Sequence, residues 1–157
     1  NAMETVGDDV SDGSMRLVLV FDISDLPDNV GIESALLSVY QADKRAGSSS
    51  PPAATNLGYV FVDHITNCAN PADYYGIEPV DVNIGILATN FLPDVWHSVD
   101  VTIALQDDLL IHKNGYSCYR LYHEIRSDDD EMADCEAWVM GDAANNQPML
   151  TVTYTMP

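Results

Sequence analysis

Carboxylates are the residues of this chain best able to do chemistry, and they are densest near its C-terminal end. Asp128, Asp129, Asp130, Glu131 and Asp134 fall in one short segment. Calcium prefers oxygen ligands from carboxylates and backbone carbonyls, which one loop can supply together. The spacing and the glycine of an EF-hand loop are missing. The segment therefore predicts either a structural calcium site or a solvated acidic loop.

Aromatic residues suggest a second kind of site, one that binds sugars. A pyranose is recognised by an exposed ring face flanked by groups that hydrogen-bond its hydroxyls. Trp96 is assigned to the hydrophobic core, because Val99 and Val101 lie on the same predicted strand. For each remaining ring, packing inside the fold is the alternative. The candidate carbohydrate-binding residues are Asn70, Asp73, Tyr74, Tyr75 and Trp138.

Catalytic signatures are missing from the sequence. With 25 acidic residues, some carboxylate pair will match the spacing of a glycosidase by chance, so their abundance indicates nothing. There is no Gly-x-Ser-x-Gly motif, and His123-Glu124 lacks the second histidine of a zincin helix. His64, His97, His112 and His123 are widely separated, as surface or core histidines are. We therefore predict no catalytic residues and no enzymatic activity.

Three cysteines, Cys68, Cys118 and Cys135, allow at most one internal disulfide, and the sequence does not select the pair. Three thiols without a disulfide are the alternative. No Cys-x-x-Cys motif is present, which argues against zinc-ribbon and thioredoxin-type sites.

The charge of the chain excludes several partners. Six basic residues against 25 acidic ones give a net charge of -19 and a pI near 4.1. Such a chain repels phosphate backbones and anionic membranes, so nucleic acid is not an expected partner. Asp8-Asp9 and Asp107-Asp108 are interpreted as solvated surface. No apolar run approaches the roughly 20 residues of a membrane span, so no membrane insertion is expected.

The elements that must position these residues are predicted to be β-strands. Residues 15–23 alternate, with Leu17, Leu19 and Phe21 on one face, as side chains do along a strand. Leu26-Pro27-Asp28-Asn29 favours a chain reversal. From Ile32 the alternation resumes, which indicates a second strand paired across that turn.

The same period recurs along the rest of the chain. Further strands are predicted at 57–65, 80–86, 96–103, 116–126, 137–140 and 149–155. One short helix is predicted over 102–110, with Thr102 as its N-cap and Gly115 as its stop. About eight strands and at most one helix predict an all-β fold, an antiparallel two-sheet β-sandwich with jelly-roll-like connections. The predicted core contains Leu19, Phe21, Leu37, Val39, Trp96, Val101, Leu150 and Val152.

At 157 residues the chain is the size of one domain. Residues 1–3, Asn-Ala-Met, are interpreted as the remnant of a purification tag and residues 4–157 as a single β-sandwich domain. No signal peptide is visible, although one could lie upstream of this sequence.

Three sequence blocks resemble a known family. They are LVFDISDLPDNVGIESALLSVY from Leu19, WHSVDVTIALQDDL from Trp96, and QPMLTVTYT from Gln147. In this order they resemble the DNRLRE-type domains and the disaggregatase-related repeats of methanogenic archaeal surface proteins. Two departures are the missing or shortened strand before Met15 and the segment 67–79, which matches nothing. The matching positions are Phe21, Asp22, Ile23, Ser24, Pro27, Ala35, Leu37, Val39, Tyr40, Trp96, Asp100, Val101, Thr102, Pro148, Leu150, Val152 and Tyr154.

The resemblance implies a jelly-roll sandwich that serves extracellular proteins as a carbohydrate-binding or surface-attachment module, often beside a catalytic domain. The expected partners are then a polysaccharide or cell-envelope glycan and the neighbouring domains of a parent protein. The expected location is extracellular, at the cell surface. A structural spacer of a cell-envelope protein, without glycan recognition, is the alternative.

Overall fold

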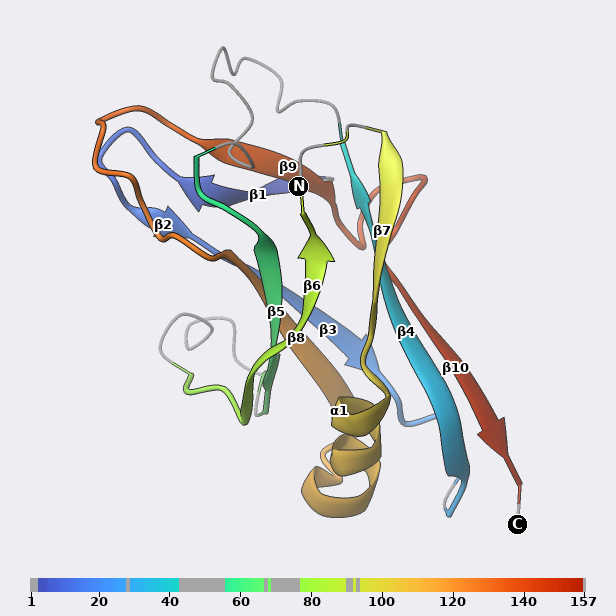
Figure 1. The fold of residues 1–157 in the computed structure, drawn as a ribbon. Coiled ribbons are helices and arrows are strands. Elements are labelled where there is room, and N and C mark those ends of the chain that lie inside the picture. Colours follow the sequence, from blue (N-terminus) through green and yellow to red (C-terminus); the bar gives the residue numbers. More distant parts are fainter. Residues whose placement is uncertain are drawn as a thin grey trace.

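A computed structural model describes residues 3–27, 29–42, 56–66, 68, 77–89, 92 and 94–156. These residues form strands connected by turns, with one helical segment (Figure 1). No helix among them combines the length and the apolar character needed to cross a membrane. The strands of the described part are β1 (Met3–Asp8), β2 (Ser14–Met15), β3 (Leu17–Asp22), β4 (Gly31–Gln41), β5 (Val60–Ile65), β6 (Asp81–Ala88), β7 (Val95–Asp100), β8 (Tyr116–His123), β9 (Cys135–Val139) and β10 (Met149–Thr155).

Two antiparallel sheets form a sandwich, as predicted. One sheet has the order β3-β8-β5-β6, and the other has the order β10-β4-β9-β1-β2, with β7 also paired to β4. Without the short β2 and the terminal β10, the sheets become β3-β8-β5-β6 and β1-β9-β4-β7. Strands β3, β4 and β5 thus alternate between the sheets, as do β7, β8 and β9. This is the strand order of an eight-stranded jelly roll.

Strands β9 and β10 share one edge of β4. Trp138 of β9 lies opposite Gln41, and β10 then continues along β4 from Ser38 to Gly31. Residues 140–148 leave the sheet between these two strands and return to it. On its other edge β4 pairs with β7, so it lies in the middle of its sheet.

The core lies between the sheets and contains most of its predicted members. Leu19, Leu37, Val39 and Val101 are buried, and three others are half-buried against them: Phe21, Leu150 and Val152. The prediction for Trp96 was wrong, because its side chain is 40% exposed. Three positions separate Trp96 from Val99. An odd separation along a strand places two residues on opposite faces, so the inward Val99 requires an outward Trp96.

The first strand was not predicted. β1 occupies the position before Met15 where a strand was expected to be missing or shortened. It pairs with β9, far away in the sequence, and with the two-residue β2. Its alternation is hidden because Thr5, Val6, Gly7 and Asp8 are all buried, so the strand lacks the polar face that identifies a strand from sequence.

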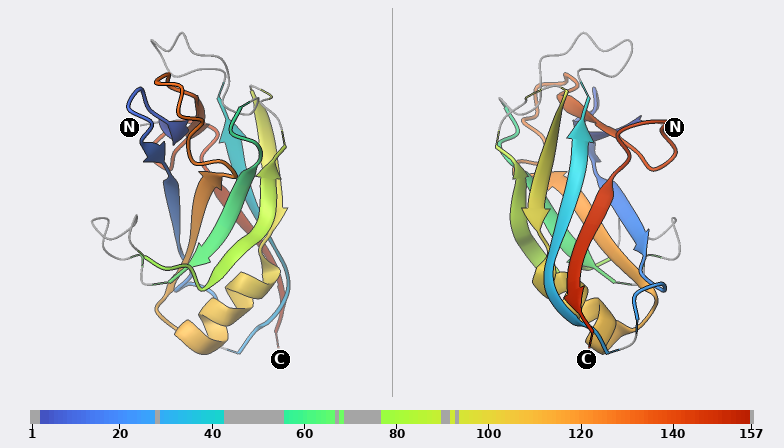
Figure 2. Two further views of the ribbon diagram at one scale, coloured as in Figure 1. Left: turned by 60° about the vertical axis from the view of Figure 1, so that its left-hand side comes forward. Right: turned by 90° about the vertical axis from the view of Figure 1, so that its right-hand side faces the viewer.

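The helical segment closes one end of the sandwich (Figure 2). Helix α1 (Thr102–Asp107) continues into one π-helical turn, η3 (Asp108–His112), and the chain then reverses at Lys113. The predicted N-cap was wrong by one residue, because Val101 holds that position, and its side chain makes no capping hydrogen bond. The Thr102 hydroxyl instead donates to Asp100 Oδ1 over 2.6 Å and accepts from Ala35 N over 2.9 Å, which ties the helix to β4.

A disulfide joins Cys68 to Cys118. Cys118 lies opposite Ile65 in the β5–β8 pair, and both pack with the disulfide against Val18 and Ile77. The disulfide therefore fastens the segment that follows β5 to the outer side of the β3-β8-β5-β6 sheet. Cys135 lies outside this disulfide.

Candidate functional site

The residues predicted to bind sugar are not assembled into a site by the described part of the chain. Asn70, Asp73, Tyr74 and Tyr75 lie outside the described residues. Trp138 is fully buried, so the prediction that it exposes a ring face was wrong. Strand β9 is covered on both faces: Trp138 packs into the main core, and its neighbours Ala137 and Val139 pack beneath Ala143.

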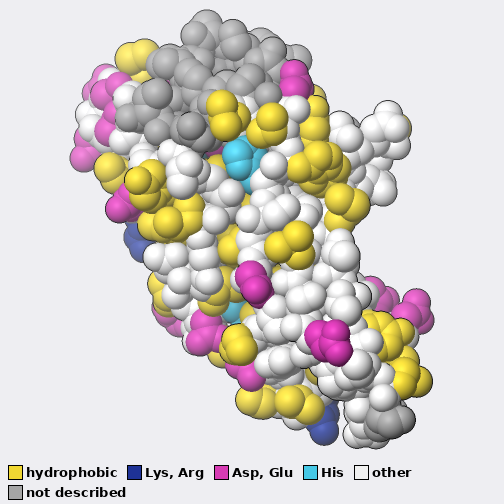
Figure 3. All heavy atoms as spheres, turned by 45° about the vertical axis from the view of Figure 1, so that its right-hand side comes forward, with side chains coloured by type: hydrophobic (Ala, Val, Ile, Leu, Met, Phe, Trp, Pro, Cys, Tyr) yellow, Lys and Arg dark blue, Asp and Glu magenta, His cyan; other side chains and the backbone are white. Residues whose placement is uncertain are grey.

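Trp96 is the tryptophan that reaches the surface. Its ring lies edge-on to Tyr40 of the neighbouring strand, with the ring centroids 5.4 Å apart. Figure 3 shows the side of the molecule that carries β4, β7 and β10, where small groups of hydrophobic side chains alternate with acidic ones. This outer face offers an aromatic pair, but Trp96 lines neither of the two pockets that follow.

A pocket of about 430 Å³ lies on the outer side of the other sheet. It forms because Arg120 and Tyr122 of β8 point away from the core, between the inward residues Tyr119, Leu121 and His123. Arg16, between β2 and β3, and Arg126, after β8, complete the basic part of its wall. We call this the arginine pocket. Its lining also includes Asp63, Glu78 and Glu124.

The three arginines have different surroundings. Arg120 is buried, donating from Nη2 to Asp63 Oδ2 over 2.7 Å and from Nη1 to the Ile77 carbonyl over 2.9 Å. Arg16 and Arg126 form no ion pair with any carboxylate among the described residues. Burial, and after it the charges of Arg120 and Arg126, lower the pKa of Arg16. The guanidinium groups are thus close enough to repel one another, and two of them have donors available to a ligand.

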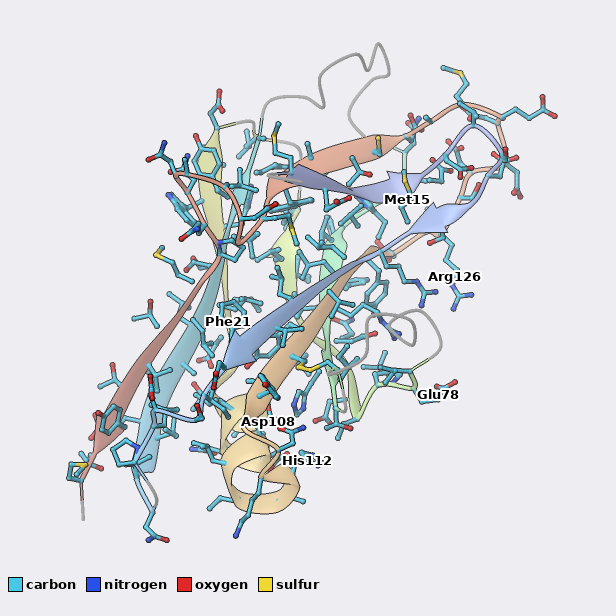
Figure 4. The ribbon with its side chains drawn as sticks, turned by 180° about the vertical axis from the view of Figure 1, so that it is seen from behind. Met15, Phe21, Glu78, Asp108, His112 and Arg126 are labelled. Atoms are coloured by element: carbon cyan, nitrogen blue, oxygen red, sulfur yellow. A yellow bond between two sulfur atoms is a disulfide. The ribbon has the colours of Figure 1, made fainter. Side chains whose placement is uncertain are left out.

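Aromatic rings extend from the arginine pocket along the sheet. Burial, and then the nearby Asp63 carboxylate, raise the pKa of Tyr122 to about 12. Its ring lies 5.9 Å from that of Phe61, which lies 6.4 Å from that of the exposed Tyr59. Figure 4 shows Arg126 and Glu78 on one side of the molecule, well away from Asp108 and His112 at the helical end. Guanidinium donors, carboxylate acceptors and ring faces are therefore brought together on this side.

Sequence comparisons add no relative to this geometry. No model of a known protein family matches the chain, and no curated protein matches it at a significant level. The resemblance to DNRLRE-type and disaggregatase-related domains therefore stays a prediction.

The predicted calcium residues are partly brought together. One carboxylate oxygen each from Asp128, Asp130 and Asp134 lies within 4.8 Å of the others. Asp129 and Glu131, also predicted as ligands, are outside this group. Both have positive φ angles, 58° and 59°, in the tight turns that carry the chain between the clustered residues.

A buried histidine–aspartate pair lies beside the helical segment. His64 Nε2 is 3.0 Å from Asp108 Oδ1, and His64 Nδ1 is 3.5 Å from Asp81 Oδ2. His64 and Asp108 are buried, so the interpretation of Asp107-Asp108 as solvated surface was wrong for Asp108. Both imidazole nitrogens face carboxylates, which leaves neither nitrogen placed to take a proton from a substrate. The imidazole and the two carboxylates therefore place opposite charges next to one another beneath the helix.

A second pocket of about 430 Å³ lies between the β3–β4 turn and η3. Its lining is largely apolar, and Lys113 is its single described cation. Asp108 also lines it, and its Oδ1 is already paired with His64.

The arginine pocket was missed at the sequence level, although two signals point to it. Six cations in 157 residues make each basic residue informative. Arg120 and Tyr122 are also two positions apart on a predicted strand, which places them on one face. Arg16 could not be added to them from sequence, because β3 and β8 are neighbours only in the fold.

Proposed function

We propose that this protein is a noncatalytic module that binds carbohydrate at the cell surface and holds an acidic sugar in the arginine pocket. The observation that carries the proposal is the position of Arg16 and Arg126, which lack a carboxylate partner among the described residues and lie beside the Tyr122 ring.

Gathering these arginines opposes the charge pattern of the chain. With a net charge of -19, solubility requires no cluster of cations, and like charges brought together repel. Three of the four cations in the described part nevertheless line one pocket, and the fourth, Lys113, lies in the other. A guanidinium group presents paired donors that match the two oxygens of a carboxylate. An anionic ligand would offset the repulsion within the cluster.

The remainder of the pocket suits a sugar better than a small inorganic anion. Glu78 and Glu124 can accept hydrogen bonds from the several hydroxyl groups of a sugar, whereas sulfate has no hydroxyl group and the phosphate dianion has only one. The rings of Tyr122, Phe61 and Tyr59 extend the apolar surface on which the faces of pyranoses stack. A uronic acid combines the three features, because it carries a carboxylate, several hydroxyls and an apolar face.

Two further features support a cell-surface location. Disulfides persist in oxidising compartments, and Cys68 and Cys118 form one. The resemblance to repeats of archaeal surface proteins points in the same direction. The alternative, a spacer that contacts neighbouring modules without binding glycan, requires no pocket in which donors and rings converge.

The test compares binding by wild type with binding by single-charge variants. Affinity electrophoresis and calorimetry would use polyuronates, a sulfated polysaccharide and a neutral glucan. Arg126→Gln removes an exposed guanidinium without an ion-pair partner, so it should weaken polyuronate binding by roughly tenfold or more and leave the melting temperature almost unchanged. Lys113→Gln, which removes one charge outside the arginine pocket, is the matched control and should bind as wild type does.

Three results would change the conclusion. Folded wild-type protein that binds none of these glycans would favour the spacer. Binding that is insensitive to Arg16→Gln and Arg126→Gln but lost in Trp96→Ala would move the site to the opposite sheet. Equal binding of uronate and neutral glucan would remove the role given to the guanidinium groups.

A further inference from the structure

A second group of residues, in the segment that follows Arg126, does not depend on the function proposed for the arginine pocket. Asp128, Asp130 and Asp134, which we call the acidic triad, place three carboxylate oxygens within 4.8 Å of one another. Asp128 and Asp130 are exposed, whereas Asp134 is 1% exposed. Exposed acidic groups often cluster without a ligand. Whether this cluster can bind one therefore depends on its buried member, Asp134.

Asp134 has an unsatisfied oxygen. Its Oδ2 accepts a 2.8 Å hydrogen bond from Asn56 Nδ2, but its Oδ1 is buried without a hydrogen-bond partner among the described residues. Burying a carboxylate oxygen without a partner is costly, since the charged group loses its hydration and gains nothing in return. A native protein keeps such an oxygen where something else satisfies it.

A second buried carboxylate adjoins the triad. Asp8, at the end of β1, is fully buried, and its Oδ1 accepts a 2.9 Å hydrogen bond from the Asp134 backbone N–H. The Asp8 N–H in turn donates to the Asp134 carbonyl over 2.9 Å. The Asp8 Oδ2 also has no hydrogen-bond partner in the described part of the chain. The interpretation of Asp8-Asp9 as solvated surface was therefore wrong for Asp8.

The buried His123 interacts electrostatically with Asp8 and Asp134, but among the described residues it forms no ion pair with either carboxylate. No lysine or arginine there forms an ion pair with Asp8 or with any member of the acidic triad. Four carboxylates, two of them buried, are thus gathered without a partner cation. Their mutual repulsion, which is least screened at the two buried carboxylates, favours the binding of a positive ion.

We infer that the acidic triad binds a divalent cation, with Asp8 as a buried carboxylate that positions Asp134 and adds negative charge behind it. The ligand atoms are all oxygens, which selects a hard cation over zinc or copper. Ligands supplied by the protein from an irregular loop suit Ca²⁺, because Mg²⁺ demands near-octahedral geometry and usually keeps several of its waters. Calcium is therefore the expected ion.

The ion would join two parts of the chain that the fold leaves weakly connected. Asp8 ends β1, and Asp134 precedes β9, which pairs with β1 from Cys135 onward. Asp128 and Asp130 belong to the irregular segment between β8 and β9. A cation held between them would fix that segment against the end of the β1–β9 ribbon.

The test uses the whole chain, stripped with a chelator and dialysed. Calcium would be titrated by calorimetry up to about 10 mM, since extracellular calcium modules bind with Kd values of about 10⁻⁴–10⁻³ M. One ion per chain is expected, and calcium should raise the melting temperature more than the same concentration of magnesium does. The comparison with magnesium is needed because any divalent cation screens a net charge of -19.

Matched variants locate the site. Asp130→Asn keeps the side-chain oxygen that accepts from the Met132 N–H but removes one ligand charge, so calcium affinity should fall about tenfold or more. Asp129→Asn removes the same charge from the next residue, outside the acidic triad, and should leave affinity within about twofold of wild type. Both replaced side chains are exposed, so both variants are expected to fold.

Two outcomes overturn the proposal. The first is folded wild-type protein that shows neither calcium-binding heat nor a larger melting shift with calcium than with magnesium. The second is an equal loss of calcium affinity in Asp129→Asn and Asp130→Asn, which would indicate a diffuse ion atmosphere. Failure of glycan binding has no bearing on either measurement, because calcium binding is measured without glycan.

Discussion

At the scale of single residues, the tryptophan assigned to the core lies at the surface, and the tryptophan considered as a sugar-binding candidate lies in the core. Trp96 was assigned to the core because its strand is apolar, yet it lies an odd number of positions from Val99 and faces outward. Trp138 follows an acidic stretch and was a candidate for an exposed sugar-binding ring, with packing as the alternative, and it is 0% exposed. Strict parity counting would have corrected the first assignment. The second could not be corrected in this way, because Ala137 and Val139 on the other face of β9 are buried too, and the strand therefore lacks the alternation that would assign Trp138 to the core.

Replacing the tryptophans one at a time should give very different costs. Trp138→Ala removes a fully buried ring and should lower the free energy of unfolding by about 3–5 kcal/mol. Trp96→Ala removes a partly exposed ring that contacts Tyr40 and should cost about 1 kcal/mol. Urea unfolding, with equal m-values, measures both. If Trp138→Ala does not fold, Trp138→Phe should still cost more than Trp96→Ala. Similar costs for the two tryptophans would contradict these assignments.

The candidate sites also show which functional residues can be predicted from the sequence alone. The acidic triad was within reach, since its members lie in one segment, although Asp129 and Glu131 could not be separated from it without the loop geometry. Asp8 could not be predicted as part of this site, because its partner Asp134 is 126 positions away. Period-two spacing finds neighbours on one strand, but contacts between distant strands come only from the fold.

At the scale of elements, one interaction between a strand and the helical segment carries a pH dependence. His64 belongs to β5, and Asp108 begins η3. Burial acts to lower the pKa of His64, but the hydrogen bond and charge of Asp108, followed by those of Asp81, outweigh it and raise the pKa above its usual value. The protonated histidine is therefore favoured in the folded state.

The raised pKa of His64 predicts how the stability of the protein changes with pH. A folded-state pKa above the unfolded value of about 6.5 adds stability that is fully present at lower pH and is lost as pH rises through the folded pKa. The stability difference between wild type and Asp108→Asn should therefore be larger at about pH 6 than at about pH 9. Urea unfolding at several pH values would measure it. Asp107→Asn, one residue earlier, is the control and should show a smaller pH dependence; equal behaviour would refute the role of Asp108.

The elements themselves were predicted unevenly. β10 and most of β4 follow the predicted alternation because each has one face on the core, although Ile32 is buried out of phase with Ala35 and Leu37. β6 does not: Val82, Ile84 and Ile86 are two positions apart, yet Ile84 packs against the core while Val82 and Ile86 are exposed. Asn83 takes a positive φ of 51°, and the β5–β6 register shifts in this region. Such irregularities change which residues face inward, and the sequence gives no sign of where they fall.

At the scale of the whole molecule, the fold class followed from the sequence, whereas the pairing of distant strands and cysteines did not. Repeated short alternating segments with turn residues leave few options besides a sandwich or barrel. The choice of Cys118 as the partner of Cys68 depends on β5 and β8 being neighbours, which is a property of the jelly-roll order. Likewise, nothing in the composition indicates that a chain this acidic collects three arginines in one pocket.

The position of the arginine pocket on an otherwise acidic molecule makes ionic strength a probe of the proposed binding of an acidic sugar. At about 0.01 M salt the Debye length is about 30 Å, so an approaching polyanion meets the net charge of -19; at about 0.1 M it is about 10 Å, and only nearby groups are felt. Association with a polyuronate should therefore become faster as salt is first added, and slow only when the guanidinium groups are themselves screened. A neutral glycan should show neither trend. Stopped-flow association rates from about 0.01 to 0.5 M salt would test this, and a rate that only falls over that range would mean that the acidic surface has no influence on the encounter.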